Sequence, residues 1–292
     1  MGTRFECVLG SIARAQIGAD PLAAALAEAA ESIVTDEHHR LSIFDPSSAL
    51  SLVNRLAARQ PVIIDDDLFA LLSRCLAYTR DTEGAFDITA GSLMASFGFR
   101  AGPSPEPAAC GCAHIQLDET SNSVRLSHPG VQLDFGAIAK GYALDLARDA
   151  LFDQGVTSAL LQGGTSSVIA IGHAPDAAPW RVRLMSDDPE SPTIDLTDRA
   201  LACSSPAGRT VDGHGHIMDT RTGRPATGTD AACVVGPSAE ICEVWSTALA
   251  VDPDLIDSLP AGYDAHLQRS GAWQSSNRPT PRTTRPEAPL HA

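Results

Sequence analysis

Strand-like and helix-like segments alternate along this chain without the regular strand–helix–strand repeat of a doubly wound parallel sheet. Short apolar runs predict strands at residues 4–9, 131–135, 158–162, 167–171, 180–185 and 231–235. Apolar residues at helical spacing predict helices at residues 21–40, 66–81 and 239–251, and another that begins within residues 136–141 and ends near Gly155. This order predicts an α+β, or mixed α/β, fold in which helices pack on a mixed sheet. The chain has neither a GxGxxG nor a P-loop pattern, which disfavours the common dinucleotide folds.

The chain is long enough for one large domain or two small ones. It has 292 residues, of which 43% are hydrophobic, so a sizeable core is expected. We predict that residues 1–273 form a single large domain. Residues 274–292 contain four prolines and three arginines without apolar periodicity, which predicts a disordered tail.

The charge balance limits the partners that the chain can bind. Its net charge is -15, and an acidic surface repels a phosphate backbone, so nucleic acid is not expected as a partner. A small anionic ligand would then need local help from a metal ion, a helix N-terminus or a buried cation.

The seven cysteines do not form the pattern of a disulfide framework, and we expect reduced thiols. Cys110 and Cys112 lack a second cysteine pair at metal-binding spacing. No apolar run is long enough to span a membrane, and no signal peptide is visible, so the sequence as given predicts a cytoplasmic protein. A leader that was removed would leave the same sequence, and this alternative stays open.

The segment from Asp134 to Gly141 joins an expected strand to an expected helix through small residues. Small residues let a ligand approach the main chain, and a helix N-terminus attracts phosphate. Lys140 lies in the first helical turn, where a cation is unfavourable unless an anion binds beside it. The alternative is a tight joint with an exposed lysine.

Three other segments carry groups that could act on a ligand. Glu243 and Thr247 are four residues apart and share a helix face, which could bind Mg²⁺, although a solvated surface more often explains this spacing. His216 could serve as a base, as a hydrogen-bond donor or as a structural residue. In the segment Gly84–Thr89, Phe86 and Asp87 could contact a ring and a sugar, or could be a buried aromatic and a helix cap.

Taken in order, these segments resemble the ApbE family, the FAD:protein FMN transferases. The matching blocks are Met1–Phe5, Ser42–Phe44 with Ser48–Asn54, Gly84–Thr89, Phe97–Phe99, Asp134–Asp145, Gln162–Gly164, His216–Gly223 and Glu243–Leu249. The resemblance covers about residues 1–265, and the blocks around Lys140 and His216 are the most specific. It implies one large ApbE-like, T-fold-like domain.

The resemblance also implies a set of ligands. Mg²⁺ would be held by the Ala137 main-chain carbonyl, the Glu243 carboxylate, Ser246 and Thr247. FAD would contact Met1, Phe44, Ala85, Phe86, Asp87, Asp134, Lys140 and the surroundings of Met218. A Thr or Ser hydroxyl of a target protein would accept FMN and AMP would leave, with His216 or a carboxylate as the base.

The chain differs from the family pattern at several positions. Glu243 stands in place of the usual Asp, and Phe44 in place of Tyr. Ser205, Thr220 and Gly215 replace a glycine, a proline and a histidine. Because Glu243 belongs to the expected metal site, two alternatives stay open: a pyrophosphatase that converts FAD to FMN and AMP, and a flavin-binding protein without catalysis. A structural protein that does not bind FAD is a further alternative.

Overall fold

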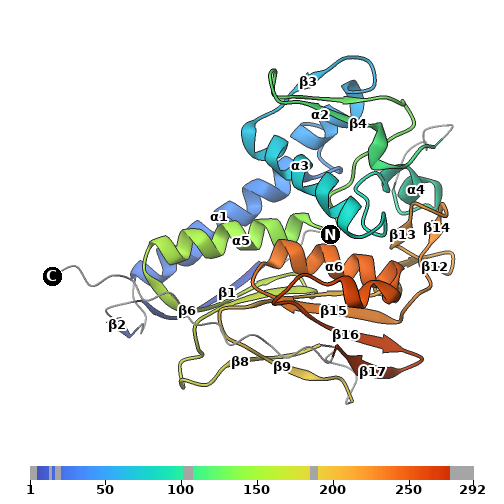
Figure 1. The fold of residues 1–292 in the computed structure, drawn as a ribbon. Helices are drawn as coiled ribbons and strands as arrows, with labels where there is room; N and C mark the ends of the chain where they lie inside the picture. Colours follow the sequence, from blue (N-terminus) through green and yellow to red (C-terminus); the bar gives the residue numbers. More distant parts are fainter. Residues whose placement is uncertain (1–4, 13–14, 17–20, 101–107, 185–189, 277–292) are drawn as a thin grey trace.

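The computed structural model describes residues 5–12, 15–16, 21–100, 108–184 and 190–276, and it has the predicted α+β architecture (Figure 1). Its centre is an eight-stranded sheet with the strand order β17-β16-β15-β10-β7-β6-β1-β2. These strands are β1 Phe5–Ile12, β2 Ala15–Gln16, β6 Val156–Gly163, β7 Ser167–Ile171, β10 Ala200–Ser204, β15 Ala231–Gly236, β16 Asp264–Arg269 and β17 Ala272–Ser275. Neighbouring strands all run antiparallel, so the expectation of mixed strand directions in this sheet was wrong.

Three helices cover one face of this sheet. They are α1 Pro21–Leu41, α5 Ala139–Asp153 and α6 Ala239–Val251 (Figure 1). Nearly all of α6 is buried, because it packs on β10 and β15 on one side and on α5 on the other. The hairpin of β8 Trp180–Arg183 and β9 Thr193–Leu196 packs through Trp180 and Leu196 against the opposite face of the sheet.

A second group of elements, which we call the cap layer, sits above the ends of these helices in Figure 1. It consists of α2 Ala49–Leu56, β3 Val62–Ile63, α3 Asp66–Asp81, α4 Gly91–Ser96, η1 Cys112–His114, β4 Ile115–Asp118 and β5 Ser123–Leu126. Buried residues of the cap layer, such as Leu72 and Phe86, belong to the same core cluster as Leu144 of α5 and Val244 of α6. The two layers therefore share one core, as expected for a single domain.

Short elements between β10 and β15, and after α6, complete the fold. They are η2 Pro206–Gly208, β11 Thr210–Val211, β12 His214–Gly215, β13 Met218–Asp219, β14 Arg224–Pro225 and η3 Pro253–Ser258. Among the described helices, none combines the length and the apolar character that a membrane crossing requires.

The predicted strand at residues 131–135 was wrong. The segment is extended, but its backbone bonds to side chains and loops and not to a strand ladder, apart from an isolated bridge at Gln132. Leu133 donates its N–H to Asn54 Oδ1 at 2.7 Å, and Asn54 Nδ2 donates to the Leu133 carbonyl at 2.9 Å. An amide side chain thus satisfies the polar groups that a neighbouring strand would have paired.

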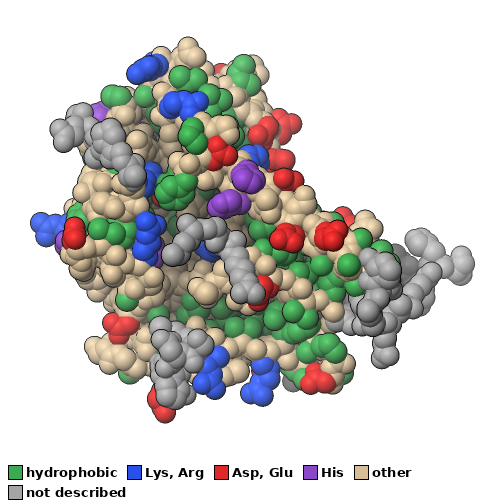
Figure 2. Space-filling view, turned by 180° about the vertical axis from the view of Figure 1, so that it is seen from behind, with side chains coloured by type: hydrophobic (Ala, Val, Ile, Leu, Met, Phe, Trp, Pro, Cys, Tyr) green, Lys and Arg blue, Asp and Glu red, His purple; other side chains and the backbone are tan. Residues whose placement is uncertain are grey.

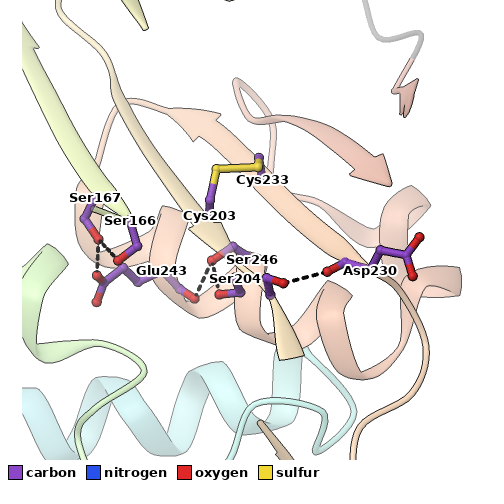
Figure 3. Close-up of a disulfide and its surroundings, with 9 residues drawn as sticks. Ser166, Ser167, Cys203, Ser204, Asp230, Cys233, Glu243 and Ser246 are labelled. Carbon is purple, nitrogen blue, oxygen red and sulfur yellow. Dashed lines mark hydrogen bonds between the residues drawn. A yellow bond between two sulfur atoms is a disulfide. The ribbon is translucent and has the colours of Figure 1, made fainter. Parts of the chain in front are cut away.

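The expectation of reduced thiols was also wrong for one pair. Cys203 of β10 and Cys233 of β15 are direct cross-strand partners and form a disulfide (Figure 3). They are 30 residues apart, and only the antiparallel pairing brings them together. Cys7, Cys75, Cys110, Cys112 and Cys242 are free.

The boundary of the expected tail is close to the end of the described residues. Strand β17 runs through Ser275, one residue beyond the predicted start of the tail at Gln274. Residues 277–292 lie outside the described residues, as does Met1.

Candidate functional site

A cavity of about 760 Å³ lies between the cap layer and one end of the sheet. On the face drawn in Figure 2, the surface is hollowed at the junction of the two layers, and Lys or Arg side chains lie beside the hollow. Twelve predicted site residues line the cavity: Phe44, Ala85, Phe86, Asp87, Asp134, Ala137, Lys140, His216, Met218, Glu243, Ser246 and Thr247. Met1 is the one predicted site residue that falls outside the described part of the chain.

Lys140 and Glu243 meet at the floor of this cavity. Lys140 Nζ lies 2.9 Å from Glu243 Oε1, which pairs the first turn of α5 with the middle of α6. The Glu243 side chain is only 5% exposed, so the alternative of a solvated helix face was wrong for this residue. Its second oxygen, Oε2, is buried and has no hydrogen-bond partner among the described residues.

The N-terminus of α5 faces the same space. Its N-cap is Ile138, which offers no side-chain hydrogen bond; the Ala139 N–H donates to the Phe135 carbonyl at 2.8 Å, whereas the Lys140 and Gly141 N–H groups have no capping side chain. Such groups attract an anion. Gly136 and Ala137, immediately before the helix, also line the cavity, so the main chain there is accessible to a ligand.

Three hydroxyl groups lie close together beside the next turn of α6. Ser204 Oγ, at the end of β10, lies 2.9 Å from Ser246 Oγ and 3.3 Å from Thr247 Oγ1. Ser246 also donates to the Glu243 carbonyl at 3.1 Å. Ser204 was not among the predicted site residues, because it comes to this place only through the packing of β10 under α6.

Asp134 and Asp87 are both engaged by protein donors. Asp134 forms an ion pair with Arg100 and accepts the Gly136 N–H at 2.7 Å. One oxygen of Asp87 accepts the N–H and hydroxyl of Thr89 and the Cys112 thiol, and the other accepts the Thr220 hydroxyl at 3.0 Å. Thr220, at a position where a proline was expected, therefore uses its hydroxyl to hold Asp87.

The aromatic residues differ strongly in exposure. Phe44 is 69% exposed at the edge of the cavity, whereas Phe86 is 1% exposed and packs edge-on against Tyr78. Phe86 thus fits the alternative of a core residue, and Phe44 is the ring that remains available to a ligand. Met218, in β13, is buried at the cavity wall.

His216 also lines the cavity, next to Arg209. Its Nδ1 is 3.3 Å from the Arg209 carbonyl, and burial, together with the nearby charges of Arg209 and Lys140, lowers the pKa of the imidazole below its usual 6.5. A neutral imidazole at pH 7 can accept a proton. Arg209 itself lies over the Phe99 ring, 5.5 Å from its centroid, and was not predicted as a site residue.

One compositional signal could have singled out Lys140 more strongly. It is the only lysine among the 21 lysine and arginine residues of the chain. Arginine and lysine differ in geometry and hydration, so a single lysine in an arginine-rich chain marks a position where the compact ammonium group matters. Arg100, Ser204 and Arg209 carry no comparable signal.

Comparison with known proteins agrees with the resemblance seen in the sequence. A profile described as "ApbE family" matches residues 1–260 of the 292. The chain belongs to the ApbE family. A protein of Rhodobacter capsulatus named FAD:protein FMN transferase is 31% identical over 232 residues, which cover 73% of this chain and 44% of that protein. A protein of the same name from Treponema pallidum is 28% identical over 285 residues, 85% of this chain and 78% of that protein.

Solved structures of the family share the fold. The ApbE protein of Thermotoga maritima superposes with a TM-score of 0.79 at 25% identity, covering 94% of this chain and 97% of that one. The flavin transferase ApbE of Vibrio cholerae gives a TM-score of 0.75 at 22% identity, over 94% and 97% of the two chains.

Proposed function

We propose that this chain is an FAD:protein FMN transferase, which moves the FMN half of FAD onto a Thr or Ser hydroxyl of a target protein and releases AMP. One observation carries the proposal: Lys140, the open N-terminus of α5 and the Glu243–Thr247 face of α6 converge on one cavity. The name of the relatives, FAD:protein FMN transferase, supports the transfer of FMN from FAD to a protein. The cavity volume of about 760 Å³ lies in the range of ligand sites.

The donor groups at the cavity floor suit Mg²⁺. Glu243 Oε2 is a buried carboxylate oxygen without a partner among the described residues, which is the state expected of an atom that binds a ligand. We assign Glu243, the Ala137 carbonyl, Ser246 and Thr247 as the residues that would hold the ion, since Mg²⁺ prefers oxygen donors and few carboxylates. The described residues contain no cluster of three His, Cys, Asp or Glu side chains that would favour a transition metal instead. Bound there, Mg²⁺ neutralises negative charge on the pyrophosphate.

The remaining roles fall to residues around this floor. Lys140 and the N–H groups of α5 bind phosphate oxygens, and Phe44 covers the flavin ring at the rim. The acceptor oxygen attacks the phosphorus of the FMN half, the bond from that phosphorus to the AMP oxygen breaks, and the hydroxyl proton passes to His216. Ala85, Asp87, Asp134 and Met218 complete the walls around FAD.

The test is a mass measurement combined with detection of AMP. The full chain is incubated with FAD, Mg²⁺ and a target protein that carries an acceptor Thr or Ser. We expect the target to gain one FMN and one AMP to be released for each. AMP release without a target would identify a pyrophosphatase, and FAD binding without AMP release would identify a flavin-binding protein; either result overturns the proposal.

A pair of variants tests whether Thr247, at the cavity floor, is needed for FMN transfer. We expect Thr247→Ala to lower the rate of FMN transfer by about 100-fold or more while the melting temperature stays unchanged, because an assigned ligand is removed. Ser73→Ala is the matched control, since Ser73 is also a helix hydroxyl but bonds to the Phe69 carbonyl on the exposed side of α3. Equal rates in the two variants would remove Thr247 from the site.

A further inference from the structure

Ser167, at the start of β7, contacts the carboxylate of Glu243 but does not itself line the cavity. Ser167 is fully buried, and its Oγ donates to Glu243 Oε1 at 2.5 Å (Figure 3). Figure 3 shows the Glu243 side chain turned towards Ser167 and away from the hydroxyls of Ser204 and Ser246. The contact joins two residues that are 76 positions apart in the sequence.

The two oxygens of Glu243 have different surroundings. Oε1 receives the Ser167 hydroxyl and the Lys140 ammonium, whereas Oε2 receives no bond from the described residues. Two donors from different elements, β7 and α5, fix both the position and the rotation of the carboxylate. They leave one defined oxygen to bind a ligand.

A glutamate needs this support more than an aspartate does. Its side chain has one more rotatable bond, and ordering it costs more conformational entropy. Mg²⁺ also tolerates little deviation from octahedral geometry, so a ligand on a longer side chain must be held in place. Glu243 stands where the family pattern has Asp, and Ser167 is the buried group that its extra length reaches.

We propose that Ser167 is a positioning residue, which holds Oε1 of Glu243 so that Oε2 binds the metal ion. This role rests on the proposed function, because it assumes that Glu243 is a metal ligand. Ser167 itself touches neither FAD nor the ion. It acts through the orientation of the carboxylate, in the way that outer hydrogen bonds orient ligands at other metal sites.

Mg²⁺ binding measured without turnover tests this role. Mg²⁺ is titrated by calorimetry into the FAD-saturated full chain, with no target protein present. We expect Ser167→Ala to weaken Mg²⁺ binding by about 10- to 100-fold, the usual effect of losing an outer hydrogen bond to a ligand. Ser158→Ala is the matched control, because Ser158 is also a buried strand serine, but its hydroxyl donates to the His173 carbonyl away from the cavity.

A double-mutant cycle separates positioning from a general effect on the sheet. An aspartate at position 243 is shorter by about 1.5 Å, one carbon–carbon bond, and does not reach Ser167. We therefore expect Ser167→Ala to have little effect on Mg²⁺ binding in the Glu243→Asp background. If Ser167 served only to pack the strand, its replacement would cost the same in both backgrounds.

The outcomes distinguish this role from the proposed function. If the unaltered chain binds Mg²⁺ and transfers FMN, but Ser167→Ala binds Mg²⁺ equally well, only the role of Ser167 is overturned. If the unaltered chain binds no Mg²⁺ in the presence of FAD, both are overturned. Should the alanine variant not fold, Ser167→Cys provides the same comparison, because a thiol keeps the size but donates weakly.

Discussion

At the scale of single residues, the site depends on side chains that ion pairs and hydrogen bonds within the protein hold in place before any ligand binds. Lys140, the only lysine of the chain, is paired with a buried carboxylate, and Asp87 and Asp134 already accept hydrogen bonds from the protein. Groups that are held in this way lose little freedom when a ligand binds. Glu243 Oε2 and the exposed ring of Phe44 are free of such bonds, and these are the groups we assign to metal and flavin.

His216 gives a prediction about pH. Burial lowers the pKa of its imidazole below 6.5, so the group is neutral at pH 7 and can take the acceptor proton. The neutral form is lost as pH falls through this lowered pKa, so kcat/KM should be level near pH 7 and fall on an acid limb that begins below pH 6.5. His216→Gln should lower kcat/KM by about 100-fold and remove that limb.

His266→Gln is the control for this pH dependence. Burial also lowers the pKa of His266, but His266 lies in β16 and does not line the cavity. We expect this variant to keep both the rate and the acid limb. An acid limb that persists in His216→Gln would show that another group is the base.

At the scale of elements, the sequence predicted those that have strong local signals. The helices at 66–81 and 239–251 were predicted with their observed bounds from apolar residues at helical spacing, and the structure shows a polar N-cap on each, Asp65 and Ser238. The segment at 131–135 was predicted to be a strand, and apolar and polar residues alternate along it. The same alternation arises whether the polar backbone groups bond to a neighbouring strand or to the Asn54 side chain. Contacts between distant residues, such as Ser167 with Glu243, leave no local signal.

The crossing of α5 and α6 depends on Gly141. A Cβ at this position would lie 2.3 Å from the Ala239 carbonyl oxygen, at the N-terminus of α6. Alanine is favoured over glycine in a helix by about 1 kcal/mol, but a backbone clash outweighs this gain. We expect Gly141→Ala to lower the free energy of unfolding by about 1–3 kcal/mol and to weaken Mg²⁺ binding, since Lys140 would move relative to Glu243.

Urea unfolding of Gly141→Ala, compared with Gly271→Ala, checks this expectation. A Cβ at Gly271 meets open space, but its φ of +77° costs a non-glycine residue about 1 kcal/mol. Gly271 lies in a hairpin away from the cavity, so Mg²⁺ binding should be unchanged there. Unaltered stability and Mg²⁺ binding in Gly141→Ala would mean that the helices can separate at no cost.

At the scale of the whole molecule, the site exists only while the cap layer stays attached to the helices on the sheet. Glu240 of α6 makes the central polar contact between them. Arg74 of α3 donates to both of its oxygens at 2.7 and 2.9 Å, and Tyr78 donates at 2.8 Å. The Arg74 guanidinium also lies 5.5 Å from the centroid of the Tyr142 ring of α5. The same helix carries Glu243 and Thr247 into the cavity, so this contact also sets the position of the proposed metal site.

The two partners of this contact differ in burial, and this difference predicts unequal effects of their removal. Arg74 is 39% exposed and can turn to water if Glu240 is lost, whereas the Glu240 side chain is 8% exposed and would be left as a buried charge if Arg74 is lost. We therefore expect Arg74→Ala to cost about 2–4 kcal/mol of unfolding free energy, and Glu240→Gln only about 1–2 kcal/mol. Urea unfolding measures both losses, with Arg181→Ala as a control that removes the exposed ion pair to Asp195 and should change stability by less than about 1 kcal/mol. An equal loss in Arg74→Ala and Glu240→Gln would show that the buried carboxylate does not depend on Arg74 for its neutralisation.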